Sequence, residues 1–142
     1  MVASRSHSIF SSLALAALLA AGSGAALAQG AELKLTGDQE VPANTSTAVG
    51  TGRIAVADDG AVSGSVSAPT LPGMAAHIHV GAAGVNGPVI IPLTGSAGGV
   101  WSVPPGAKLN AEQLAAYKAG GLYVNIHTPD HKGGEIRTQL IP

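Results

Sequence analysis

Cysteine is absent from the 142-residue chain. Its absence excludes disulfide cross-links and thiolate metal sites, so a folded domain must be stabilised by its apolar core. Aromatic residues make up only 3% of the chain, and the core must therefore be built mainly from Val, Ile, Leu and Ala. Seven Lys and Arg against eight Asp and Glu leave no basic excess. A nucleic-acid partner, which requires a basic face, is therefore not expected.

Residues 1–28 differ in composition from the rest of the chain. Arg5 precedes an almost wholly apolar run from Ile9 to Ala21, and small residues follow up to Ala28. This order is typical of a Sec-type signal peptide, with cleavage predicted after Ala28. The alternative is an uncleaved membrane anchor, but the run is short for a bilayer span. We expect a mature domain of residues 29–142 that is periplasmic or secreted and has no membrane attachment after cleavage.

Short segments in which polar and apolar residues alternate dominate the predicted mature chain. Such alternation indicates β-strands with one buried face, and twenty Gly and nine Pro suggest many turns between them. The segments are residues 32–35, 50–57, 61–67, 76–80, 89–93, 100–103, 122–128 and 135–140. Residues 39–42 are a weaker strand candidate because Pro42 has no amide hydrogen. Residues 94–99 are expected to form a turn.

One helix is predicted, from Asn110 to Ala119. Asn110 can cap its first turn together with Gln113, three residues later, and Gly120 is placed to end it. With no alternation of strands and helices, the fold class is all-β. We expect an antiparallel β-sandwich or barrel of the Greek-key, superoxide-dismutase-like or immunoglobulin-like kind, carrying one short helix.

Three of the four histidines after residue 28 fall in two of the predicted strands. His77 and His79 are two residues apart and therefore share one strand face, while Ile78 lies on the other. In the second strand, Tyr123, Asn125 and His127 share a face by the same rule. The fourth histidine, His131, follows in a turn and is expected to be solvated.

Imidazoles at positions i and i+2 on one strand face are spaced to converge on one ion. A third imidazole from a neighbouring strand would complete a three-nitrogen site, and neutral imidazole suits copper, zinc and nickel. The hypothesis is a metal site of His77, His79 and His127, with copper as the expected ion and zinc as the alternative. Asn125, Tyr123 or Glu135 would orient the ligands by hydrogen bonds. In the competing interpretation the histidines form a polar cluster that satisfies its own hydrogen bonds and binds no metal.

Three motifs, in this order, resemble those of the CHRD domain, the family named for chordin and also common in bacterial exported proteins. They are residues 35–42 (LTGDQEVP), residues 76–81 (AHIHVG) with 87–89 (GPV), and residues 123–128 (YVNIHT) with 133–137 (GGEIR). The resemblance spans essentially the whole predicted mature chain. It implies little about activity, because in chordin these domains accompany growth-factor-binding modules and have no clear biochemical role of their own.

A His-x-His strand in an exported antiparallel β-sandwich also resembles the copper-binding strand of Cu,Zn superoxide dismutase. The cysteine pair and the His-rich zinc loop of that enzyme are missing here. No nucleophile elbow is present, and Glu135 has no evident carboxylate partner, so no catalytic residues are predicted. Two functions therefore remain: an exported copper-binding protein, or a non-enzymatic interaction module without metal whose protein partner is unknown. Any enzymatic activity would be a copper-dependent redox reaction.

Overall fold

The computed structural model describes residues 29–142, and the predicted signal peptide lies outside the described residues. It contains nine β-strands, one α-helix and one 3-10 helix, η1. The strands are β1 (Glu32–Thr36), β2 (Val49–Val56), β3 (Val62–Ser67), β4 (Ala75–Val80), β5 (Val89–Pro92), β6 (Thr94–Ser96), β7 (Val100–Ser102), β8 (Leu122–His127) and β9 (Ile136–Gln139). The helices are η1 (Gly37–Gln39) and α1 (Ala111–Lys118).

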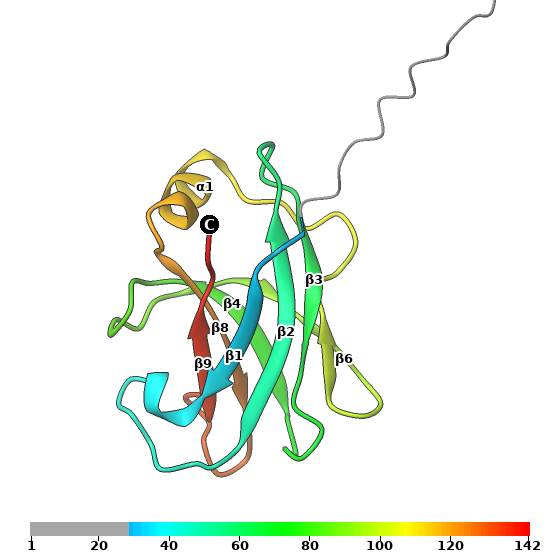
Figure 1. Cartoon of the computed structure of the whole chain (residues 1–142), viewed down its shortest axis with the longest axis vertical. Helices are drawn as coiled ribbons and strands as arrows, with labels where there is room; N and C mark the ends of the chain where they lie inside the picture. Colours follow the sequence, from blue (N-terminus) through cyan, green and yellow to red (C-terminus); the bar gives the residue numbers. More distant parts are fainter. Residues whose placement is uncertain (1–28) are drawn as a thin grey trace, which may run out of the picture.

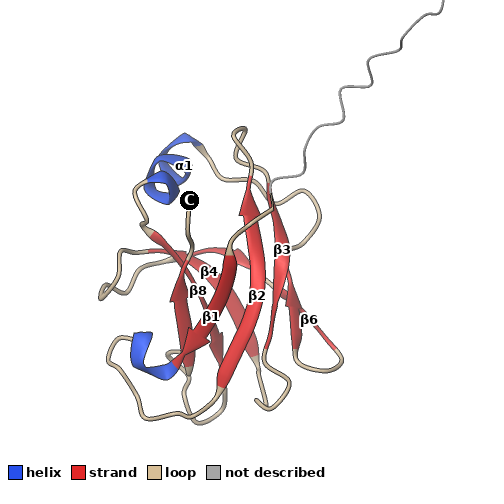
Figure 2. Ribbon diagram, viewed as in Figure 1, coloured by secondary structure: helices blue, strands red, loops and turns tan. Residues whose placement is uncertain are grey.

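All nine strands belong to one antiparallel sheet, curled into a nearly closed barrel (Figures 1 and 2). Its order is β5-β4-β8-β9-β1-β2-β3-β7-β6. The two end strands, β5 and β6, are consecutive in the chain and are joined through Leu93, whose backbone N–H donates to Ala76 O of β4 at 2.9 Å. The predicted all-β antiparallel barrel with one short α-helix is therefore confirmed.

Strand alternation determines which residues fill the barrel. In β1, Leu33 and Leu35 are buried while the residues beside them are more exposed, as the sequence predicts. Asp59-Gly60, a dipeptide typical of hairpin turns, lies in the connection between β2 and β3, which pair as a hairpin. Apolar side chains from all parts of the described chain meet inside, and Trp101 packs at the edge of this core.

Helix α1 lies beside the C-terminal end of the chain (Figure 1). Its first turn is held by the predicted capping box, in which Asn110 Oδ1 accepts from Gln113 N at 2.8 Å and Gln113 Oε1 accepts from Asn110 N at 3.0 Å. Tyr117 is buried and donates its hydroxyl to Ile141 O at 2.8 Å. No helix in residues 29–142 is long and apolar enough to cross a bilayer.

Two local predictions were wrong. Residues 94–96 form strand β6, because they pair with β7 as a hairpin across residues 97–99. Segment 39–42 is not a strand: it leaves η1 and runs into a loop. That loop and the β4–β5 connection project on the same side of β9 (Figure 1) and touch where Asn86 Nδ2 donates to Val41 O at 2.7 Å. Together they cover the outer face of part of the barrel.

Candidate metal centre

The pairing of β4 with β8 brings the predicted histidines together. The antiparallel register places Ala75 opposite His127, His77 opposite Asn125, and His79 opposite Tyr123. Since alternate residues share a face, the three imidazoles lie on the outside of the barrel wall, while Ile78 is buried in the core on the inside. The expected proximity of the two motif strands is therefore present in the structure.

The three rings form a compact cluster. His77 Nδ1 and His127 Nε2 are 3.0 Å apart. One ring nitrogen from each of His77, His79 and His127 can be chosen so that all lie within 4.8 Å of one another. The ring centroids are separated by 4.8 Å for His77 and His127, 5.7 Å for His77 and His79, and 6.1 Å for His79 and His127. Nitrogens bound at about 2 Å to one ion are about 3 Å apart, so small side-chain movements would close the set around a metal.

The cluster is enclosed by loops, although it lies on the outer face of the barrel. Every residue of β8 is buried, because one face packs on the core and the other lies beneath the covering loops. His79 and His127 have exposed fractions of 7% and 8%. His77 is half-buried, so the cluster opens to solvent at this ring. An ion reaching the site would meet His77 first.

Two of the histidines are oriented by backbone carbonyls. His127 Nδ1 lies 2.9 Å from Lys132 O, and His79 Nδ1 lies 2.9 Å from Gly87 O. A carbonyl only accepts, so each Nδ1 carries the proton and each Nε2 carries a lone pair. This is the usual support for a metal-binding histidine, in which a hydrogen bond at one nitrogen fixes the ring so that the other nitrogen can bind.

His79 is also held by a stack of rings. Tyr123 lies parallel to it, with centroids 4.6 Å apart and an interplanar angle of 6°. The guanidinium carbon of Arg137 sits 3.3 Å from the centroid of the same tyrosine ring. Arg137 is 1% exposed and donates to the backbone carbonyls of Ala82 and Val85 at 3.0 and 2.9 Å. The arginine thus holds the β4–β5 loop and packs Tyr123 against the histidine.

Electrostatics favour the neutral form of two of the histidines. Burial lowers the pKa of His77, and the neighbouring His127 and His79 lower it further. Burial also lowers the pKa of His79, although the nearby oxygens of Gly87 and Asn125 act in the opposite direction. Neutral imidazole has the lone pair that a metal requires, so both side chains are available as ligands near pH 7.

Asn125 was one of the polar residues suggested from the sequence to orient the histidines, and it does contact one of them. It is 2% exposed, and its Oδ1 lies 3.0 Å from His79 Nε2. Glu135, the other polar residue suggested as a partner, is not part of the cluster. Its two carboxylate oxygens accept from Ser46 Oγ and Thr128 Oγ1, both at 2.6 Å. It ties the covering loop to the end of β8.

His131 also lies apart from the three clustered histidines. It is half-buried in the β8–β9 turn, where its backbone exchanges hydrogen bonds with the backbone of Thr128 at 3.2 and 3.3 Å. Among the described residues, the one group of His, Cys, Asp or Glu side chains with metal-binding geometry is His77, His79 and His127. His131 is therefore available as a control position.

Glu40 was assigned no role from the sequence. This carboxyl group follows η1 and is 6% exposed. Burial raises the pKa of Glu40 to about 7, while the charge of Arg137 and the amide of Asn125 lower it in part. Its Oε1 is buried without a hydrogen-bond partner among the described residues. A glutamate in a polar loop gives no sequence signal of burial, since the covering layer forms only when residues far apart in the chain meet.

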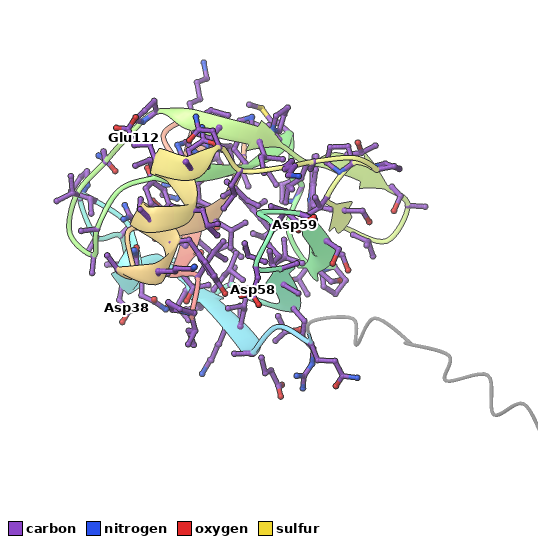
Figure 3. The ribbon with its side chains drawn as sticks, turned by 90° about the horizontal axis from the view of Figure 1, so that it is seen from above. Asp38, Asp58, Asp59 and Glu112 are labelled. Atoms are coloured by element: carbon purple, nitrogen blue, oxygen red, sulfur yellow. The ribbon has the colours of Figure 1, made fainter. Side chains whose placement is uncertain are left out.

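Other acidic side chains do not gather near one another in a way that suggests chemistry. Asp38, Asp58, Asp59 and Glu112 are all exposed, and Figure 3 shows them spread over η1, the β2–β3 turn and α1. Only Asp58 and Asp59 are neighbours, and Asp59 Oδ1 is used to accept from Ala61 N at 3.0 Å. These four residues offer no paired carboxylates of the kind used for general acid and base catalysis.

The sequence model of the CHRD domain matches residues 32–140. The chain belongs to the CHRD domain family. The match covers all nine strands of the barrel, so the motifs that carry the resemblance lie within one continuous domain. No curated protein and no solved structure matches this CHRD domain. Its function must therefore be argued from the histidine cluster itself.

Proposed function

We propose that this CHRD domain binds one copper ion through His77, His79 and His127. The observation that carries the proposal is the convergence of three imidazoles within 4.8 Å, two of them already oriented by backbone carbonyls. Little reorganisation is needed, because the strands, the stacked Tyr123 and the covering loops hold the rings before any ion arrives. Preorganisation of this kind reduces the free-energy cost of binding.

The donor set supports copper, with zinc as the alternative. All three ligands are nitrogens, no carboxylate belongs to the cluster, and the chain has no cysteine. Calcium and magnesium prefer oxygen ligands, and iron–sulfur clusters require thiolates. For a site of given nitrogen ligands, affinity among divalent first-row metals is highest for Cu²⁺. Bound copper would bring redox chemistry, and without predicted catalytic residues we propose that the domain carries or buffers the ion.

The setting we propose is the periplasm or the extracellular space. It follows from the signal-peptide pattern of residues 1–28 in the sequence. An oxidising compartment favours Cu²⁺, the form that imidazole ligands suit. Export to such a compartment is consistent with copper as the ion, and export and metal identity can be measured separately.

One observation favours a second candidate, a metal-free interaction module. The histidines already have hydrogen-bond partners without any ion: His77 with His127, His79 with Gly87, and His127 with Lys132. Each such bond contributes about 1 kcal/mol to stability, so the cluster can persist as a structural element. The two candidates differ in one measurable respect, which is whether the cluster takes up metal.

Elemental analysis separates the two candidates. Residues 29–142 would be produced without a His-tag, loaded with copper and zinc in separate samples, and freed of excess metal by gel filtration. The metal-binding function predicts one copper per chain, and none in a variant in which His77, His79 and His127 are all replaced by Ala. Equal metal content in the two proteins, or no metal in either, would favour the interaction module.

A further inference from the structure

The side-chain oxygen of Asn125 faces the cluster of three histidines. It lies opposite His77 in the β4–β8 register and on the same face as His127, so it is surrounded by the three histidines. Its Oδ1 is 3.0 Å from His79 Nε2. It is 2% exposed, so water does not compete for this oxygen.

The other side of the Asn125 amide fixes this orientation. Its Nδ2 points to Gly133 O at 3.5 Å. Nδ2 and Glu40 Oε1 both lie close to the position that a Cβ atom at Gly134 would occupy, so Glu40 borders this side of the amide. An amide turned by 180° would place its oxygen against the Gly133 carbonyl oxygen, which can only accept. The NH₂ group therefore faces Glu40 and Gly133, and the oxygen faces the histidines.

This orientation sets two acceptors against each other. His79 Nδ1 donates to Gly87 O, which leaves a lone pair on Nε2. That lone pair meets a second one on Asn125 Oδ1 at 3.0 Å. Two donor atoms bound at about 2.0–2.2 Å to one ion are separated by about 3 Å. A metal ion bound by both lone pairs would therefore remove the repulsion between them. The His77 Nδ1 to His127 Nε2 distance is also 3.0 Å.

We propose that Asn125 Oδ1 is the fourth ligand of the metal, and that Glu40 is the positioning residue that turns this oxygen toward the ion. This inference rests on the proposed metal-binding function. It gives a four-coordinate N₃O site, a donor set that Cu²⁺ and Zn²⁺ both accept.

The inference bears on what the domain does with its ion. Catalytic metal sites keep one coordination position open for water or substrate, whereas sites that hold an ion for other purposes fill all four positions with protein atoms. With Asn125 in place, the position facing the buried side of the cluster is filled. The site then holds an ion in storage or transport, and exchange takes place at the half-buried His77.

A crystal structure of residues 29–142 loaded with zinc at pH 8 tests the inference directly. The expected result is zinc bound to the three histidines, with Asn125 Oδ1 about 2.0–2.2 Å from the ion. A zinc ion bound by the histidines and a water, with Asn125 more than about 3 Å away, would overturn the fourth ligand and leave the proposed function standing. A histidine cluster that stays empty in zinc-loaded and in copper-loaded crystals would refute both.

Copper affinities of variants test the role of Glu40. Asn125→Ala removes the proposed fourth ligand and should weaken copper binding about 100-fold. Glu40→Leu should weaken it about 10-fold, because partners that orient ligands contribute about 10- to 100-fold to metal affinity. Glu40→Gln should keep most of the wild-type copper affinity, since the amide oxygen of the glutamine can accept from Asn125 Nδ2. Glu112→Leu, at an exposed carboxylate on α1, is the control and should change affinity less than about 2-fold.

Spectra of the copper-loaded variants exclude a purely structural role for Glu40. If Glu40 positions Asn125, the electron paramagnetic resonance spectrum of Glu40→Leu should shift toward that of Asn125→Ala. Glu40→Gln should retain the wild-type spectrum. A wild-type spectrum in Glu40→Leu together with reduced thermal stability would show that the residue supports only the fold, and the positioning role would then be wrong.

Discussion

His77 Nδ1 and His127 Nε2 lie 3.0 Å apart across the pairing of β4 with β8, although fifty residues separate them in the chain. Since His127 Nδ1 donates to Lys132 O, its Nε2 accepts, and His77 must supply the proton between the two rings. A metal bound by both nitrogens replaces that proton. Binding therefore releases a proton from the cluster or moves it to the solvent-facing nitrogen of His77.

The first prediction concerns Glu40 and pH. Its folded-state pKa of about 7 lies above the ordinary value of 4.5, so the folded protein binds more protons than the unfolded chain between these values. Its contribution to stability is present below about pH 4.5 and is lost as pH rises through about 7. Urea denaturation of the metal-free protein should show that Glu40→Gln raises the free energy of unfolding more at pH 8 than at pH 5.

His77 and His79 contribute with the opposite sign. Their pKa values are lowered in the folded state, so the unfolded chain binds more protons, and stability falls as pH drops below the ordinary value of 6.5. In Glu40→Gln the rise in the free energy of unfolding with pH that comes from His77 and His79 should remain. It should be easier to see because the opposite contribution of Glu40 is gone. A Glu40→Gln protein with the same pH profile as the wild type would show that Glu40 is not the buried group described above.

The second prediction separates stability from metal binding. Burial works against ionisation of Glu135, but hydrogen bonds from Ser46 and Thr128 hold the pKa of its carboxyl group below the usual value. Glu135→Gln weakens both bonds and should lower the free energy of unfolding by about 1–2 kcal/mol, measured by urea denaturation at pH 7. Copper affinity should stay within about 3-fold of wild type, since Glu135 does not contact the histidines. A large loss of affinity would place this residue in the site.

The third prediction concerns export. The pattern Ala26-Leu27-Ala28 predicts cleavage after Ala28. Intact-mass measurement of protein secreted by its own host should give a chain that begins at Gln29, in part cyclised to pyroglutamate. A mass that retains residues 9–21 would contradict the export assignment and with it the proposed compartment.

The alternation of side chains along β-strands made the cluster of three histidines predictable. His77 and His79 on one strand and His127 on another had to face the same way once the two strands were neighbours, and period-two alternation needs no long-range information. The capping box at Asn110 and the Asp-Gly hairpin were predictable for the same reason, because each depends on residues a few positions apart. These local signals also indicated the fold class.

What could not be predicted depends on contacts between distant segments. Glu40 is buried because its loop folds over β8, and Arg137 is buried because the β4–β5 loop wraps around its guanidinium. Neither residue has a sequence pattern that distinguishes it from an exposed charge. Glu135, one of three residues suggested as histidine partners, failed for the same reason, since one of its two actual partners, Ser46, lies 89 positions away.

The central claim is that His77, His79 and His127 form one copper site, and affinity measurements on single-alanine variants test it most directly. Competition titration of Cu²⁺ should show that His77→Ala, His79→Ala and His127→Ala each weaken binding by more than about 100-fold, because each removes a ligand. His131→Ala, the matched control in the nearby turn, should change affinity less than about 2-fold. Equal, weak effects of all four substitutions would mark adventitious surface binding and contradict the account.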